Sequence, residues 1–237
     1  MIFSRRHGFI FLANRKTAST SIAIALSEAC GPNDVITPLG KDEILRKQAG
    51  HRGPQNFIPW NQQLRYCGLR ISRKLTGRSI DHELRRIGFH THMSAAQASE
   101  LIGIDAWNKA HKFCFVRNPW DRAISQYFWE IRGKANPVTL DAFISGPSLA
   151  NAAQRSQSIY TIKDNIAVDR ICRFESVHDE LLTIYKLLAI PGMPLLPKAK
   201  SQYREDKRHY RDILSKSQAD RIAAIFAKEI EIGHYSF

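Results

Sequence analysis

Apolar residues form two kinds of pattern along the chain, and these patterns alternate. An apolar run at 8–13 and a segment at 112–116 that is apolar after Lys112 are typical of strands buried on both faces of a sheet. Apolar residues at helical spacing follow these runs, as at 19–30. The patterns predict strands at 8–13, 112–116, 159–162 and 168–174, and helices at 19–30, 94–101, 119–132, 140–144, 177–188 and 217–230.

This order of elements predicts one α/β domain that spans residues 1–237. Strands that alternate with helices form a central parallel sheet flanked by helices. The sequence contains no internal repeat or long linker that would divide it. Such sheets bind ligands at the carboxyl ends of their strands. Lys16 and Arg117 both fall at such ends, so we expect a ligand site between them.

The segment after the first predicted strand indicates an anion-binding loop. A helix begins there, and the N–H groups of its first turn attract negative charge. Lysine and hydroxyl side chains add further donors. We expect the loop to hold a phosphate-like group. Its residues are Lys16, Thr17, Ala18, Ser19, Thr20 and Ser21.

Two alternatives apply to this loop. A serine or threonine can cap the helix without any ligand, although four hydroxyl groups exceed what a cap requires. An ATP- or GTP-binding loop would have the pattern Gly-x-x-x-x-Gly-Lys-[Ser/Thr]. Ile10 and Arg15 stand at its two glycine positions, and the strand at 112–116 ends in Arg117 instead of a magnesium-binding acid. A metal-dependent nucleoside triphosphatase is therefore disfavoured.

A second basic loop follows the strand at 112–116. Arg117 leaves that strand, Pro119 suits the first turn of a helix, and Ser125 lies eight positions after Arg117. A loop arginine and a helix serine can hold one phosphate from two sides, the arginine through its bidentate fork. The alternative is an ordinary surface pairing around Asp121 and Arg122.

The net charge of +13 indicates an anionic partner, such as nucleic acid, an acidic polysaccharide, a membrane surface or a phosphorylated cofactor. We predict that residues 31–88 form an irregular, insertion-like segment. Its part from 41 to 88 holds eleven lysine and arginine residues against four acids, which is more than half of the excess charge. The segment is either a solvated loop or a surface for an anionic acceptor.

The cysteines and the length of the apolar runs bear on the compartment. Cys30, Cys67, Cys114 and Cys172 are widely spaced, which favours free thiols in a reducing environment. No apolar run approaches the roughly 18 residues of a membrane span, and 8–13 is too short for a signal peptide. We expect a cytoplasmic protein without stable membrane insertion.

Together, the two basic loops resemble those of the sulfotransferase superfamily. The loop Lys16-Thr17-Ala18-Ser19-Thr20-Ser21 is most similar to that of heparan sulfate and uronyl 2-O-sulfotransferases and related bacterial enzymes. The segment Gly88-Phe89-His90-Thr91-His92 is similar to the His-x-His segment of the same carbohydrate branch. The likeness covers most of residues 8–130. It departs at Arg15, where the relatives usually carry proline.

The resemblance implies a P-loop-like sulfotransferase fold and transfer of a sulfuryl group from PAPS (3′-phosphoadenylyl sulfate) to a hydroxyl, leaving 3′,5′-ADP. It implies that residues 16–21 hold the 5′-phosphosulfate, and that Arg117 and Ser125 hold the 3′-phosphate. The expected acceptor is a carbohydrate or another hydroxyl compound, and the basic segment favours an anionic one. Neither a metal nor nucleic acid is expected as a partner.

His90 and His92 lie two positions apart, and in an extended segment such residues face the same side. A metal site would need further ligands, which the neighbouring sequence lacks. The resemblance makes both histidines catalytic candidates together with Lys16. His90 is favoured as the base that takes the proton of the acceptor hydroxyl, a role that suits an imidazole at neutral pH.

Two other functions stay open on the residues alone. A nucleotide or small-molecule kinase shares this sheet topology, and a non-enzymatic binder of nucleic acid or acidic glycan would use the +13 charge. The basic segment 198–211 is equally open. It either covers the nucleotide, as late basic loops do in sulfotransferases, or is a solvated loop.

Overall fold

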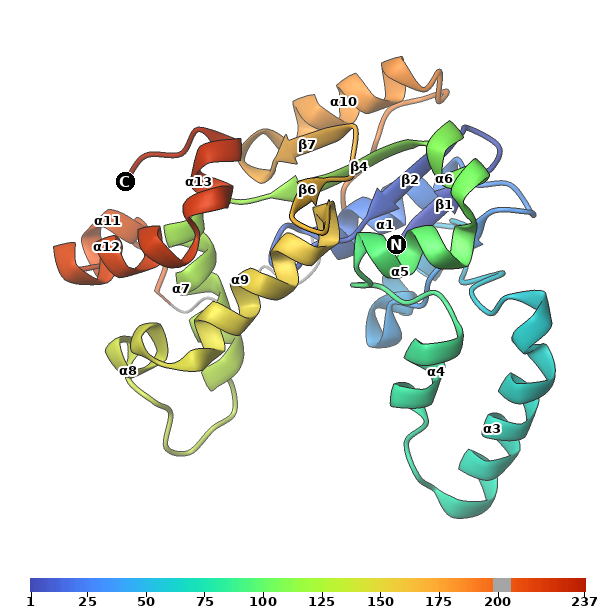
Figure 1. The fold of residues 1–237 in the computed structure, drawn as a ribbon, viewed down its shortest axis with the longest axis horizontal. Coiled ribbons are helices and arrows are strands. Elements are labelled where there is room, and N and C mark those ends of the chain that lie inside the picture. Colours follow the sequence, from blue (N-terminus) through green and yellow to red (C-terminus); the bar gives the residue numbers. More distant parts are fainter. Residues whose placement is uncertain (198–205) are drawn as a thin grey trace.

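The computed structural model describes residues 1–197 and 206–237. At the centre of this described part lies a five-stranded sheet with the strand order β3–β1–β2–β4–β7 (Figure 1). The strands are β1 Ile2–Ser4, β2 Phe9–Leu12, β3 Val35–Ile36, β4 His111–Val116 and β7 Arg170–Arg173. Strands β2, β4 and β7 run parallel, whereas β1 pairs antiparallel with β2 and β3. The predicted parallel core is confirmed, with an antiparallel edge added to it.

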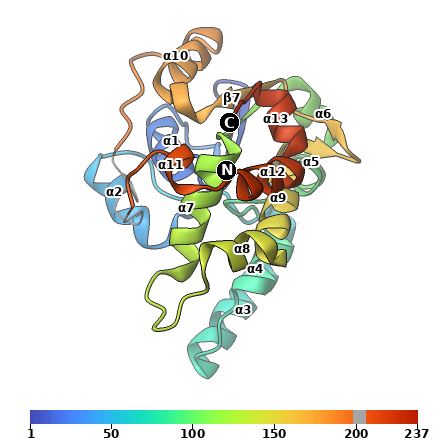
Figure 2. The same cartoon turned by 90° about the vertical axis from the view of Figure 1, so that its left-hand side faces the viewer.

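Helices cover both faces of this sheet (Figures 1 and 2). Helices α1 and α10 pack on one face, and α5, α6, α7, α8, α9 and α12 contribute to the core on the other. The helices of the described part are α1 Ser19–Glu28, α2 Glu43–Gln48, α3 Gln63–Thr76, α4 Asp81–Ile87, α5 Ala95–Ile102, α6 Ile104–Lys109, α7 Pro119–Ile131, α8 Leu140–Ser145, α9 Pro147–Tyr160, α10 Val177–Leu187, α11 Tyr210–Ile213, α12 Lys216–Ile225 and α13 Ala227–Gly233.

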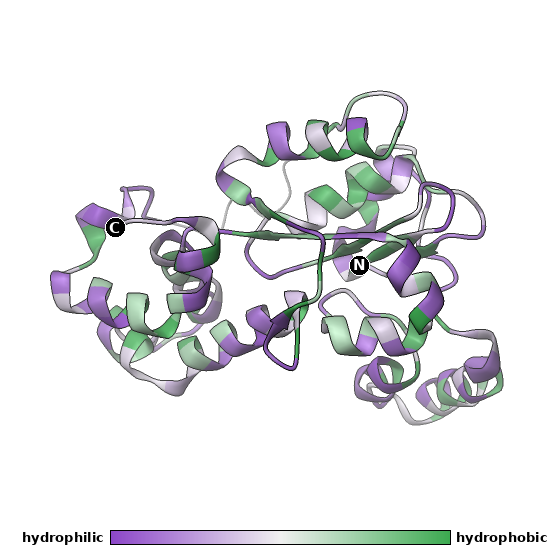
Figure 3. Ribbon diagram, turned by 45° about the horizontal axis from the view of Figure 1, so that its top comes forward, coloured by the Kyte–Doolittle hydropathy of each residue, from purple (hydrophilic) through white to green (hydrophobic). Residues whose placement is uncertain are grey.

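Alternating side chains of the central strands separate two apolar cores, because successive residues of a strand point to opposite faces. Phe9 and Phe11 of β2 lie in the core beneath α1 and α10, together with Phe113 and Phe115 of β4. Their apolar neighbours along both strands lie in the other core. The central strands are accordingly largely apolar on both faces, which explains why apolar residues follow one another in their sequence. Figure 3 shows the hydropathy of each residue along the ribbon.

Three sequence-based predictions about elements are corrected by the structure. Residues 31–88 are not irregular: they contain α2, α3 and α4, whose charged residues interrupt the apolar pattern. The strand predicted at 159–162 begins only at Thr161, since α9 continues to Tyr160, and it forms the separate hairpin of β5 Thr161–Ile162 with β6 Asn165–Ile166. The helix predicted at 217–230 is divided at Phe226 into α12 and α13.

A buried polar network ties the end of β2 to three helices. Arg122 of α7 and Glu229 of α13 form an ion pair of 2.9 Å, and their side chains are only 3% and 4% exposed. Ser156 of α9 accepts hydrogen bonds from Arg122 and from the side-chain amide of Asn14, and its hydroxyl donates to Glu229. Asn14 in turn donates to the carbonyl of Phe115 in β4. The network therefore fixes where the chain leaves the sheet and enters the loop at 15–18.

We expect Glu229→Ala to lower the free energy of unfolding by about 3–5 kcal/mol, because it leaves the guanidinium of Arg122 buried without its counter-charge. Chemical denaturation of the two proteins measures this difference. Asp220→Ala is the matched control, since its ion pair with Lys216 is exposed and such pairs contribute about 0.5 kcal/mol. A loss in Glu229→Ala no larger than in the control would contradict the role given to the network.

Candidate active site

The loop between β2 and α1 has the shape of an anion cradle although it lacks glycine. Lys16 and Ala18 adopt left-handed conformations, with φ of 64° and 51°, which side-chain-bearing residues rarely do. Ala18 is the N-cap of α1. Within the described residues no side chain caps this helix, and its first turn has no acid. The amide groups of the first turn are thus available to an anion.

The four hydroxyl residues of the loop differ in their surroundings. Thr17 is fully buried, and its hydroxyl donates to the carbonyl of Asn14 at 3.2 Å, so it braces the loop. Ser19, Thr20 and Ser21 lie in the first turn of α1 and are buried as well. The sequence alone does not distinguish the four hydroxyl residues. In the structure Thr17 stabilises the loop, whereas the other three lie in the first turn of α1.

Arg117 joins the two basic loops that the sequence singles out. Its guanidinium donates to the main-chain carbonyl of Lys16 at 3.0 Å and to the hydroxyl of Ser125 at 3.4 Å. Asp121 holds the same guanidinium in an ion pair of 2.6 Å, and the ring of Phe174 lies 4.6 Å from it. The structure thus brings Arg117, Ser125 and the cradle together. The ion pair with Asp121, which the sequence offered as an alternative, is present at the same time.

Trp129, which the sequence did not single out, lies next to Lys16 and also contacts Arg132. The ammonium group of Lys16 lies 4.8 Å from the centre of the Trp129 ring, and the guanidinium of Arg132 lies 3.6 Å from that ring. Trp129 belongs to α7, the helix that also carries Ser125. The spacing of four residues between Ser125 and Trp129 on one helix was a usable signal, because such residues share a face.

The histidine pair is divided between two environments. Nδ1 of His92 donates to the carbonyl of Ala13 at 2.7 Å, directly before the cradle. This bond sets Nδ1 as the protonated nitrogen and makes Nε2 the proton acceptor of the neutral ring. Nδ1 of His90 is buried without a hydrogen-bond partner among the described residues. Of the two, His92 is the one that contacts the cradle.

His90 lines a basic cavity of about 490 Å³ beside α4. Burial first, and then nearby positive charges with Arg85 foremost, lower the pKa of His90 to about 4. Burial and the charges of Arg155 and Arg85 likewise lower the pKa of Arg15. Because the positive charges of Arg15 and Arg85 lie close to one another and to His90, an anion would be stabilised in this region. The cavity is lined by His82, Arg85, Arg86, His90, Met93, Gln97, Glu100 and Leu101.

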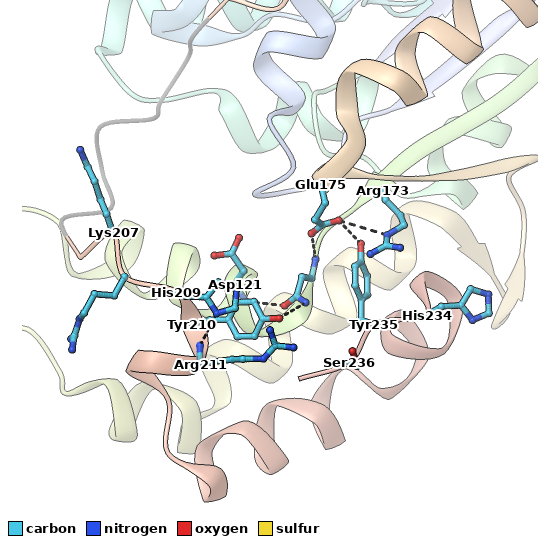
Figure 4. Close-up of a pocket in the computed structure, with 12 residues that line it drawn as sticks. Asp121, Arg173, Glu175, Lys207, His209, Tyr210, Arg211, His234, Tyr235 and Ser236 are labelled. Atoms are coloured by element: carbon cyan, nitrogen blue, oxygen red, sulfur yellow. Dashed lines mark hydrogen bonds and ion pairs between the residues drawn. The ribbon is translucent and has the colours of Figure 1, made fainter.

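A second cavity, of about 470 Å³, adjoins Arg117 through Asn118 and Asp121 (Figure 4). Tyr235 points at Glu175 and donates to it at 2.9 Å, and Glu175 also accepts from the main-chain N–H of Asn118. The basic segment predicted at 198–211 reaches this cavity with residues 207–211, while its part at 198–205 lies outside the described residues. The basic lining residues are Arg173, Lys207, Arg208, His209, Arg211 and His234.

Two further observations concern metals and membranes. Within the ranges 1–197 and 206–237, the acidic, histidine and cysteine side chains nowhere gather in threes that could hold a metal ion. In the same ranges, none of the helices has both the length and the apolar character needed to cross a bilayer.

We expect the free energy of unfolding to decrease as the pH falls from 6.5 toward 4, in part because of His90. The unfolded chain binds a proton at His90 near its usual pKa of 6.5, whereas the folded protein does so only at about 4. Denaturation at a series of pH values measures the slope, and His90→Gln should flatten it. An unchanged slope in that variant would mean that His90 titrates normally.

The similarity of this chain to known proteins extends over nearly its whole length. A solved structure to which it is similar is a sulfotransferase from Alicyclobacillus acidocaldarius, with 14% identity over 97% of this chain and 96% of that chain and a TM-score of 0.40. No curated protein matches the sequence. The model of the sulfotransferase family matches residues 1–236. Since this match extends over nearly the entire sequence, the chain belongs to the sulfotransferase family.

Proposed function

We propose that the protein transfers a sulfuryl group from PAPS to a hydroxyl of a carbohydrate acceptor. The observation that carries this proposal is the position of Arg117, whose guanidinium contacts both the cradle at Lys16 and the hydroxyl of Ser125. Two anion-binding elements joined by one arginine suit a ligand with two separate phosphate groups. PAPS is such a ligand, and it would supply the activated sulfuryl group.

In this proposal the cradle holds the 5′-phosphosulfate. Its contacts would come from Lys16, from the hydroxyls of Ser19, Thr20 and Ser21, and from the amides around Ala18, while Thr17 keeps the loop in shape. The absence of an acid in the first turn of α1 supports this assignment, because a carboxylate there would compete with the anion. Lys16 and the amides supply the positive charge, so the proposal includes no metal ion.

Arg117 and Ser125 would hold the 3′-phosphate, and the adjoining basic cavity would take the rest of the nucleotide. The ion pair with Asp121 orients the guanidinium and leaves N–H groups directed at Ser125. Lys207, Arg208 and Arg211 line this cavity, so residues 207–211 would cover the nucleotide in this proposal.

The acceptor would bind on the side of the two histidines. His92 is the better candidate for the base, because its bond to Ala13 leaves Nε2 as a proton acceptor beside the cradle. The sequence favours His90, but a pKa of about 4 makes that ring a weak base. His90 and the arginines of its cavity would instead contact the acceptor, and their charge favours an anionic saccharide. Four free cysteines agree with a reducing, cytoplasmic setting.

We expect 3′,5′-ADP to stabilise the protein in the absence of metal, by about 2.7 kcal/mol at a ligand concentration of 100 times Kd. For a chain of this length that corresponds to a rise in Tm of roughly 5–11 °C, which a thermal shift assay detects. Arg117→Ala should abolish the rise, and Arg78→Ala, which removes an exposed arginine, should leave it intact. Stabilisation by ATP with magnesium but not by 3′,5′-ADP would favour a kinase and overturn the proposal.

We expect Lys16→Ala to reduce the rate of sulfuryl transfer by about 10²–10³, because the charge of the departing nucleotide loses a positioned donor. Transfer from labelled PAPS to a panel of hydroxyl acceptors measures the rate, and Lys186→Ala is the control for the loss of an exposed lysine.

In the same assay we expect His92→Gln to lower the rate by at least about 10² and His90→Gln to act mainly on KM for the acceptor. The opposite pattern, with the loss of rate confined to His90→Gln, would make His90 the base.

A further inference from the structure

Helices α3 and α4 form a hairpin that projects from the body of the protein (Figures 1 and 2). Helix α3 has 14 residues, and none of them is buried. A surface helix usually carries polar residues on the side that faces water. On α3 that side also carries large apolar residues, which calls for a partner.

The outer surface of α3 and the turn before it carry a row of large apolar side chains, which we call the apolar stripe: Trp60, Leu64, Ile71 and Leu75. Trp60 and Leu64 are each 91% exposed, and Leu75 is 80% exposed. Their spacing of four, seven and four residues places them on one side of the helix. Contiguous exposed apolar surface of this kind marks an interaction site.

Three of the four residues of the apolar stripe lie away from the groove between α3 and α4. The inner side of α3 is formed by Tyr66, which contacts Phe57 edge-on with ring centres 6.2 Å apart. A groove of about 700 Å³ between the helices is lined by Tyr66 of α3 and by Ile80 and Leu84 from the α4 side, and Ile71 of the apolar stripe also lines it. Trp60, Leu64 and Leu75 are not among its lining residues, and they are the most exposed members of the apolar stripe.

The charge around the apolar stripe has one sign. From residue 44 to residue 80 the chain has no aspartate or glutamate, and α3 with the turn after it carries Arg65, Arg70, Arg73, Lys74 and Arg78. At 3.6 residues per turn, Arg65 and Lys74 flank the apolar stripe on its two sides. An apolar row bordered by cations is the pattern of a helix that lies in the surface of an anionic membrane.

We propose that α3 docks on an anionic phospholipid surface, with Trp60, Leu64, Ile71 and Leu75 entering the boundary between headgroups and acyl chains and the flanking cations contacting the lipid phosphates. A second copy of the chain is a poorer occupant, because two such helices would bring cations together with no acids to offset them. The helix lies on the bilayer without spanning it. This docking is independent of the sulfuryl-transfer chemistry.

The test is co-sedimentation of the full chain with vesicles of phosphatidylcholine alone and with vesicles of phosphatidylcholine and phosphatidylglycerol in equal amounts. We expect binding to the second kind that weakens as salt is added. Leu64→Glu/Leu75→Glu should weaken the partition at least about 100-fold. Arg65→Gln/Lys74→Gln should weaken it roughly 30-fold, since each basic residue near the surface contributes about fivefold.

The matched control is Ile104→Glu/Leu187→Glu, which makes the same change of charge at two exposed apolar residues outside the hairpin. It should bind vesicles nearly as the parent does. The emission of Trp60 should shift to shorter wavelength on binding, and Trp60→Phe should remove that shift. Undiminished binding by Leu64→Glu/Leu75→Glu would overturn the proposal. So would a concentration-dependent dimer, dissociated by the same variant, in a protein that ignores both kinds of vesicle.

Discussion

Arg122 and Glu229 meet in the interior, where neither charge reaches water, so each depends on the other and on the hydroxyl of Ser156. Their pair connects α7, α9 and α13, which come from distant parts of the chain. Through Ser156 it also holds Asn14, the residue at which the chain turns from β2 into the cradle. Arg117 and Ser125 flank Arg122 in sequence, so the same pair anchors the start of α7, the helix that Arg117 precedes and that carries Ser125.

The parts of the fold that the sequence reveals are those in which local pattern and burial agree. Strands β2 and β4 are buried on both faces, and a continuous apolar run identifies them. Strands β1 and β3 are too short, at three and two residues, to leave a pattern of their own. Helix α3 is long enough to leave a pattern, but the sequence did not predict it. Its apolar residues have helical spacing, yet none of its residues is buried, and its many charged residues resemble those of a solvated loop.

The candidate site follows the same division. Lys16, Arg117 and Ser125 could be brought together from the sequence, because the topological rule for parallel strands places their loops at one edge. The different surroundings of His90 and His92 could not be predicted from the sequence, because they depend on which carbonyl and which helix each ring contacts after folding. The spacing of Trp129 from Ser125 places both on one face of α7, but the contact between Trp129 and Lys16 depends on the folded position of a loop more than a hundred residues earlier.

The cradle reaches its unusual backbone shape through contacts from outside the loop. Asn14 holds its beginning, Arg117 holds the carbonyl of Lys16, and His92 holds the carbonyl of Ala13. Left-handed conformations at two residues with side chains persist only where the surroundings over-determine them. In the proposed function, an arriving anion would meet amides that are already aligned, so that the loss of chain entropy falls on folding instead of binding. Affinity and selectivity would then depend on the rigidity of this frame as much as on the groups that touch the anion.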